Sequence, residues 1–286
     1  MKRERETGAG EKGREAPTFM SGYENGPPKT AKGFSPFPTG SLEEETRNGK
    51  MNKPLVSIIL CTYNRKHLVR RAIASVFAQT LVDWELVIVD DGSTDGSERF
   101  LRTTARRDPR IVFLRHANRG LALSRNAGVA AASGKYITFL DSDDELKPVH
   151  LEKRVHYLES HPSADALHGG IQPIGPRSKQ YVADATRPGK KIHLSKCYVA
   201  GTLFMKRGAY LRLRGFGSIE YGDDYDFMQR LMKRYRLVRV PWRTYLYHLD
   251  SENRLCDLYE EGGVEAIWKF RGKRDGTKLT RAAGSG

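Results

Sequence analysis

From residue 53 onward, short apolar runs alternate with segments of helical periodicity. The first run, 55–61, is almost continuously apolar, and an apolar run that is covered on both faces is typical of a parallel sheet. Further strands are expected at 84–89, 110–114 and 135–140, and helices at 64–77, 95–107 and 120–132. Alternation of this kind predicts βαβ units, and hence an α/β fold with a doubly wound, mostly parallel sheet.

The segments on either side of this alternation have a different character. Residues 1–52 are rich in Gly, Pro and Glu and have no sustained apolar period, so a disordered extension is expected there. Residues 146–250 carry shorter strand-like runs and one amphipathic helix that begins at Asp223. Residues 251–286 read as a polar, basic tail.

The composition limits the classes of partner. Of the net charge of +15, all but +1 lies outside residues 1–50, which hold nine Lys/Arg and eight Asp/Glu. A basic surface attracts polyanions: nucleic acid, anionic lipid or phosphorylated substrates. No apolar run reaches the length of a membrane span, and no apolar core of a secretory signal is found. The three widely spaced cysteines favour a reducing cytoplasm.

A cluster of carboxylates, Asp141, Asp143 and Asp144, follows the strand expected at 135–140. Carboxylates are not left buried and unpaired, and hard oxygen ligands suit Mg²⁺ or Mn²⁺ held together with substrate phosphates. The carboxyl end of a strand is also where an open α/β fold binds its ligand. For an isolated cluster, a solvated turn is an equally good interpretation.

Two other strands of the predicted sheet also end in polar residues, at 62–65 and at 90–93. In an open parallel sheet these ends converge with residues 141–144 on one crevice. The glycine patterns of dinucleotide-binding and phosphate-loop proteins are absent from the sequence. Neither the dinucleotide-binding nor the phosphate-loop fingerprint therefore applies to this crevice.

Four motifs in order resemble glycosyltransferase family 2, whose members have a GT-A fold. They are the segments 56–65, 89–95, 118–128 and 135–144, and the resemblance covers residues 54–250. It implies a nucleotide-sugar-binding half at 53–145 and a smaller acceptor-binding half at 146–250. It also implies an inverting glycosyltransferase that uses a nucleotide sugar, a UDP-sugar above all, with Mn²⁺ or Mg²⁺ as cofactor.

The resemblance implies a role for each matching residue. Those on the nucleotide side are Thr62 and Asn64 against the nucleotide, Asp91 on the base, Asn118 and Arg125 beside the diphosphate, and Asp141 on ribose or sugar hydroxyls. Asp143 would hold the divalent metal that bridges the diphosphate. A cation there would stabilise the negative charge that develops on the leaving group.

The general base is expected at Asp224. Family members usually have Glu-Asp at this place, whereas this chain has Asp223-Asp224. A carboxylate with its ordinary pKa of about 3.9 is ionised at neutral pH and ready to accept a hydroxyl proton. These acids also fit a purely structural role at a helix N-terminus, where they complement the helix dipole.

His248 falls where many family members have a histidine near the diphosphate or metal, and it is a candidate metal ligand. A lone histidine at a strand end is also commonly structural, so both interpretations stay open.

The predicted activity is transfer of a sugar to a hydroxyl of a carbohydrate or lipid-linked acceptor, in cell-surface polysaccharide or glycolipid synthesis. A cytoplasmic protein is expected, with peripheral contact to the inner face of an anionic membrane through its basic surface. No specific nucleic acid is expected. The alternatives are an inactive polyanion- or membrane-binding module on the same fold, and a nucleotidyltransferase.

Overall fold

The computed structural model describes residues 43–45, 53–187 and 189–272. Its largest element is an eight-stranded sheet in the order β1-β4-β3-β2-β5-β11-β7-β12. The strands are β1 (Glu43–Glu45), β2 (Val56–Thr62), β3 (Trp84–Asp90), β4 (Ile111–Arg115), β5 (Tyr136–Asp141), β7 (Ala166–His168), β11 (Phe204–Lys206) and β12 (Leu237–Arg239). The four strands predicted from the apolar runs are all present.

The half of this sheet that precedes residue 145 is parallel from β4 to β5. Strand β11 joins β5 in the antiparallel direction, which makes the whole sheet mixed. The chain order reverses at β2, which pairs with both β3 and β5. Thr62 lies opposite Asp90, and Cys61 lies opposite Asp141, so the strand ends are level. The predicted α/β fold is confirmed, and its switch point lies where a ligand site is expected.

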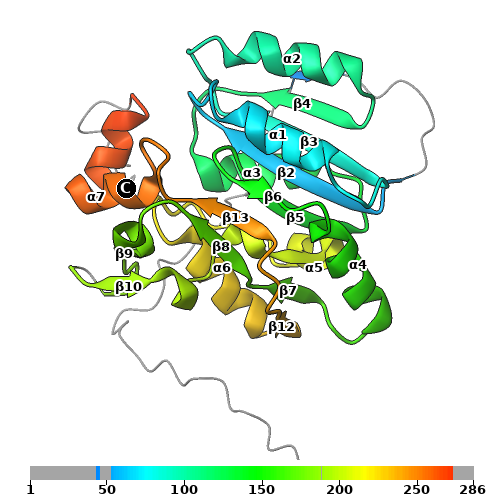
Figure 1. The fold of residues 1–286 in the computed structure, drawn as a ribbon. Coiled ribbons are helices and arrows are strands. Elements are labelled where there is room, and N and C mark those ends of the chain that lie inside the picture. Colours follow the sequence, from blue (N-terminus) through cyan, green and yellow to red (C-terminus); the bar gives the residue numbers. More distant parts are fainter. Residues whose placement is uncertain (1–42, 46–52, 188, 273–286) are drawn as a thin grey trace, which may run out of the picture.

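Helices cover both faces of the sheet (Figure 1). Residues from α1 (Val69–Phe77), α2 (Ser97–Arg107) and α4 (His150–Ser160) pack with one set of strand side chains. Residues from α3 (Leu121–Ala131), α5 (Arg207–Arg212) and α6 (Asp223–Met232) pack with the alternate set. The two layers arise because successive side chains of a strand point to opposite faces.

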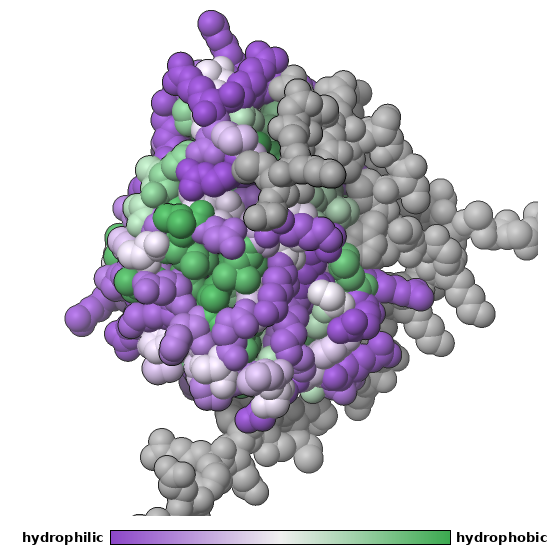
Figure 2. Space-filling model, turned by 90° about the vertical axis from the view of Figure 1, so that its right-hand side faces the viewer, coloured by the Kyte–Doolittle hydropathy of each residue, from purple (hydrophilic) through white to green (hydrophobic). Residues whose placement is uncertain are grey.

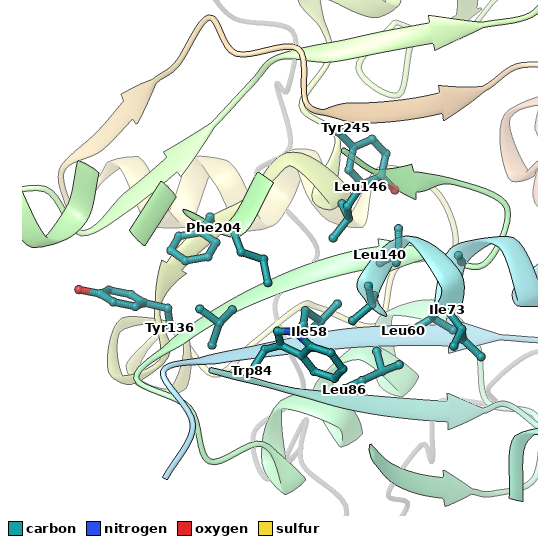
Figure 3. Close-up of a cluster of buried hydrophobic side chains, with 14 of the residues drawn as sticks. Ile58, Leu60, Ile73, Trp84, Leu86, Tyr136, Leu140, Leu146, Phe204 and Tyr245 are labelled. Atoms are coloured by element: carbon teal, nitrogen blue, oxygen red, sulfur yellow. The ribbon is translucent and has the colours of Figure 1, made fainter. Parts of the chain in front are cut away.

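The first of these layers is shown in Figure 3, where Ile58, Leu60 and Leu86 of the sheet meet Ile73 of α1. All four side chains are at most 4% exposed. On the other face, α3 approaches β2 closely: a Cβ at Gly128 would lie 2.4 Å from the side chain of Ile59. Gly128 therefore allows α3 to lie directly on β2 and β3.

Smaller elements complete the second half. A three-stranded sheet has the order β6-β13-β8, and β9 and β10 form a hairpin. Their bounds are β6 (Glu145–Leu146), β8 (Ile171–Ile174), β9 (Tyr181–Ala183), β10 (Lys191–His193) and β13 (Tyr245–His248). Three single 3₁₀ turns lie at η1 (Arg177–Gln180), η2 (Leu194–Lys196) and η3 (Ala200–Thr202).

The structure corrects two expectations about the chain ends. Glu43–Glu45, inside the segment expected to be disordered, pair with β4 in the antiparallel direction. The other residues of 1–52 lie outside the described part, and disorder stays a prediction for them. The supposed polar tail from residue 251 contains α7 (Leu255–Phe270), which buries Leu258 and Ile267. Its periodicity was hidden because Gly262 and Gly263 are non-helical and kink the helix.

The outer surface is mostly hydrophilic on the face shown in Figure 2. On the face shown in Figure 2, hydrophilic residues surround a central group of apolar ones. In the described part of the chain, no helix combines the length and apolar character that a membrane crossing requires.

Candidate functional site

A cavity of about 1100 Å³ opens at the carboxyl ends of β2 and β5 and extends to α6, β13 and α7. Seven of the nine residues predicted from the sequence line it: Thr62, Asp91, Arg125, Asp141, Asp143, Asp224 and His248. They come from both halves of the chain. The structure therefore brings the predicted nucleotide side and the predicted base into one space.

Asn64 and Asn118 are outside this lining. The Asn64 carboxamide oxygen accepts the Thr94 backbone N–H at 2.8 Å, and the Asn64 N–H donates to the Ser93 hydroxyl at 2.9 Å. Asn64 thus ties the loop after β2 to the loop after β3, and it does not cap α1, whose N-cap position is held by Leu68. Both polar side-chain atoms of Asn118 are buried without a hydrogen-bond partner among the described residues.

On the predicted nucleotide side, the Asp91 carboxylate already accepts hydrogen bonds from the backbone. It accepts the backbone N–H groups of Arg119 and Gly120 at 2.8 and 2.9 Å, and His116 Nδ1 lies 3.2 Å away. Gly120 has a φ of 99°, a conformation that glycine adopts without strain. Asp91 therefore holds the start of α3 in place, while its side chain also borders the cavity.

Two buried polar atoms in the cavity wall have no partner among the described residues: the Thr62 hydroxyl oxygen and Arg254 Nε. Buried polar groups in folded proteins are normally hydrogen-bonded, and an unpartnered one costs about 1–3 kcal/mol.

Arg125 joins the two halves of the site. Its guanidinium is almost fully buried and donates to Asp141 at 2.9 Å and to Asp223 at 3.1 Å. Burial by itself would lower the pKa of Arg125, but the two carboxylates outweigh this and raise it. One cation therefore fixes the end of β5 against the first turn of α6.

Replacing Arg125 with glutamine is expected to lower the free energy of unfolding by about 3–5 kcal/mol, because two carboxylates would then lack their shared cation. Lysine keeps the charge but not the planar guanidinium, so Arg125→Lys should lower the free energy of unfolding by less than Arg125→Gln does. Denaturant titration at neutral pH measures both. As a control, Lys135→Gln removes an exposed ion pair with Glu159 and should change stability by at most about 1 kcal/mol. Equal losses in Arg125→Gln and this control would contradict the structural role of Arg125.

The three carboxylates of the acidic cluster have different surroundings. Asp144 is buried, and its carboxylate accepts the His248 backbone N–H at 2.8 Å. Burial, and then the neighbouring Asp143, raise the pKa of Asp144 well above its ordinary value. Asp143 borders the cavity, with Arg65 Nη1 3.8 Å away, and burial raises its pKa as well. Asp144 thus ties β13 to the turn, whereas Asp143 is open to a ligand.

Both ring nitrogens of His248 lie near carboxylates. Its Nε2 lies 2.7 Å from Glu145, and its Nδ1 lies 3.7 Å from Asp250. Within the described ranges, no three or more His, Cys, Asp or Glu side chains are grouped as a metal site. Mg²⁺ and similar ions do not need such a group, because one or two carboxylates suffice when substrate phosphates supply further oxygens. The hard oxygens of Asp143 and Asp141, both in the cavity wall, fit that pattern.

Asp224 lies in the first turn of α6 and borders the cavity. Burial, and then the adjacent Asp223, raise its pKa to about 7, while Arg125 acts in the opposite direction. The expectation of an ordinary, fully ionised carboxylate at neutral pH is therefore wrong. A carboxylate with a pKa near the working pH is better suited to accept a proton in the transition state.

Four arginines in the cavity wall were not predicted: Arg65, Arg254, Arg271, and Arg239 of β12. Arg65 donates to the backbone carbonyls of Glu252 and Asn253, and Arg271 pairs with Glu220. Arg65 belongs to the first motif and could have been found there. Arg254 and Arg271 lie at the two ends of α7, a helix whose periodicity is not evident in the sequence.

Comparisons with known proteins agree with this geometry. The model of glycosyl transferase family 2 matches residues 57–212. An uncharacterized glycosyltransferase of Methanocaldococcus jannaschii is 38% identical over 246 residues, which cover 77% of this chain and 82% of that protein. A putative teichuronic acid biosynthesis glycosyltransferase, TuaG of Bacillus subtilis, is 41% identical over 107 residues, covering 37% of this chain and 42% of that protein.

Two solved structures share the fold. A mannosyltransferase from Pyrobaculum calidifontis in complex with GDP-Man and Mn²⁺ has a TM-score of 0.57 at 21% identity, covering 77% of this chain and 61% of that one. TarS 1-349 of S. aureus in complex with UDP-GlcNAc has a TM-score of 0.56 at 20% identity, covering 71% and 60%. This chain therefore matches less than two thirds of the length of either structure. The matched family model covers more than half of the chain, and the chain belongs to glycosyl transferase family 2.

Proposed function

We propose that the protein transfers a sugar from a nucleotide-sugar donor, a UDP-sugar, to a hydroxyl of a carbohydrate or lipid-linked acceptor with inversion at the anomeric carbon. One observation carries the proposal. The cavity holds the donor-side residues Thr62, Asp141 and Asp143 together with the carboxylate Asp224 from the other half of the chain. Family membership supports the class of reaction.

In the proposed mechanism Asp224 accepts the proton of the acceptor hydroxyl. The acceptor oxygen forms a bond to the anomeric carbon as the bond to the nucleoside diphosphate breaks, and the electron pair of that bond leaves with the diphosphate. Arg125 keeps α6 and β5 in register, so that base and donor stay aligned. Positioning of this kind lowers the barrier because the reactants need no further ordering.

Asp143 would hold a divalent cation, with Asp141 beside it. A bound Mn²⁺ or Mg²⁺ would supply positive charge for the leaving diphosphate. The Mn²⁺ in the complex of the Pyrobaculum mannosyltransferase supports the use of a divalent cation. Arg65, Arg254 and Arg271 border the same cavity and add protein cations for a diphosphate.

The pH dependence of the reaction should report on Asp224. Because its pKa is about 7, protonation removes the base as the pH falls. We expect kcat/KM to fall about tenfold per pH unit below 7 and to be constant well above it. Burial contributes most to this value, and the charged groups that also affect it are Asp223, Arg125 and Asp141. A profile that stays flat down to about pH 5 would contradict the base assignment.

A hydrolysis and transfer screen over nucleotide sugars, with Mn²⁺ and with Mg²⁺, tests the function itself. Release of a nucleoside diphosphate together with sugar transfer supports the proposal. Release of pyrophosphate would indicate nucleotidyl transfer, and salt-sensitive polyanion binding without turnover of any donor would indicate an inactive binding module. The named role of TuaG supports a place in cell-surface polysaccharide synthesis.

A further inference from the structure

The cavity continues beyond the proposed base, along α6. Tyr225, Gln229 and Met232 of this helix all border it. With a rise of 1.5 Å per residue, Met232 lies about 12 Å from Asp224 along the helix axis. This distance exceeds the width of one sugar ring. This extension of the cavity along α6, the arm, therefore has room for an acceptor that is longer than the single sugar ring carrying the reacting hydroxyl.

Aromatic rings line this arm in sequence. The ring of Tyr225, next to Asp224, lies 6.3 Å from the ring of Tyr198, and Tyr198 lies 5.2 Å from His168. The Tyr198 hydroxyl reaches Met232 Sδ at 3.6 Å, which places Tyr198 beside the far end of α6. Tyr225, Tyr198 and His168 are all half-buried and border the cavity. They offer flat apolar surfaces against which the C–H faces of sugar rings can pack.

The arm ends in two cations, Arg239 and Lys196. Arg239 of β12 lies opposite His168 of β7 in the sheet register. The Arg239 guanidinium donates to the backbone carbonyl of Ser195 at 3.0 Å, and Ser195 directly precedes Lys196. Both side chains are exposed and border the cavity. Within the described part of the chain, neither forms an ion pair with a carboxylate. Among the described residues, the positive charge at this end of the arm is therefore uncompensated.

The other titratable groups of the arm do not cancel this charge. Burial, and then Arg239, lower the pKa of His168 to about 4, so its ring is neutral at pH 7. The Asp184 carboxylate also borders the cavity, but it accepts hydrogen bonds from Thr186 and pairs with Arg187. A negative group of a ligand would therefore find free cationic donors only at Arg239 and Lys196 in this described part of the wall.

We infer that the acceptor is an anionic saccharide, whose negative group lies at least one sugar ring away from the accepting hydroxyl. This inference rests on the proposed function and names its acceptor class. The hydroxyl lies at Asp224, the sugar rings pack along Tyr225 and Tyr198, and Arg239 with Lys196 binds the anion. A guanidinium binds carboxylates and phosphates through two parallel hydrogen bonds. The anion is therefore a uronate or a phosphate ester.

Binding of matched disaccharides to the whole protein tests this inference without any donor. Cellobiuronic acid differs from cellobiose only by a carboxylate in place of a hydroxymethyl group, and cellobiose 1-phosphate adds a phosphate. Calorimetry at low salt is expected to show that at least one anionic probe binds about tenfold more tightly than cellobiose. A preference for the first probe indicates a uronate, and a preference for the second indicates a phosphate ester.

Two variants in the arm and one control outside it separate the arm from the general basic surface. Arg239→Gln, or Lys196→Gln, should reduce the preference to within about twofold, because each removes one of the two cations that would pair with the anion. Arg243→Gln makes the same charge change at an exposed arginine outside the cavity lining, and it should keep the preference. Thermal melting of each variant checks that it is folded.

Equal binding of anionic and neutral probes, or no binding of any probe, overturns the inference. Equal loss of preference in Arg239→Gln and Arg243→Gln also overturns it, because the net charge alone would then explain the effect. Donor hydrolysis by the unmodified protein is measured separately. Its absence would contradict the proposed function and would leave the binding comparison unaffected.

Discussion

Replacing Asp224 with asparagine is expected to lower turnover by about 10²–10⁴-fold, while the affinity for the nucleotide-sugar donor stays close to that of the unmodified protein. Asparagine has nearly the same shape, so α6 and its contacts should persist, but it cannot accept the proton. The donor residues Thr62 and Asp143 lie on the other half of the chain, at the ends of β2 and β5. Steady-state transfer assays measure turnover, and calorimetry measures donor affinity.

A control for this variant lies on the same turn of α6. Asp226 pairs with Arg230 and is outside the cavity lining, so Asp226→Asn removes a carboxylate from the helix without touching the site. It should retain turnover within a few fold. Near-normal turnover in Asp224→Asn would remove Asp224 from the role of base, and so would equal losses in the two variants.

Replacing Asp143 with alanine is expected to abolish the part of donor affinity that depends on a divalent cation. Asp141, Asp143 and Asp144 all border the cavity, but the Asp141 carboxylate is already paired with Arg125 and that of Asp144 accepts the His248 backbone N–H. Removing a ligand from a cation that contacts a diphosphate should cost several kcal/mol. Nucleotide titration with and without Mn²⁺ gives the difference directly.

Asp250→Ala is the matched control for Asp143. It removes an exposed carboxylate near His248, outside the cavity lining, and makes the same change in net charge. The stimulation of donor binding by Mn²⁺ should survive in this control. If Mn²⁺ has the same effect on the affinity of Asp143→Ala and of the unmodified protein, the metal assignment to Asp143 is wrong.

The regular half of the fold could be predicted because its signal is local. The apolar runs that became β2, β3, β4 and β5 are buried on both faces, and such strands are apolar almost throughout. Strand β1 and helix α7 lack such a signal. Glu43–Glu45 join the sheet only through pairing with β4, and α7 is interrupted by two glycines. Both depend on contacts with residues distant in the chain.

The sequence by itself determined the family, the order of the motifs and the strand ends at which Thr62, Asp91, Asp141 and Asp143 lie. These follow from residue type and spacing along a strand-and-helix pattern. Only the tertiary structure decided which partners these groups have and how their pKa values are shifted. Arg125 bridges Asp141 and Asp223, and Asp91 holds the start of α3. Burial beside Asp223 raises the pKa of Asp224 to about 7. Ion pairing and desolvation depend on distances between residues far apart in the chain, which local patterns do not contain.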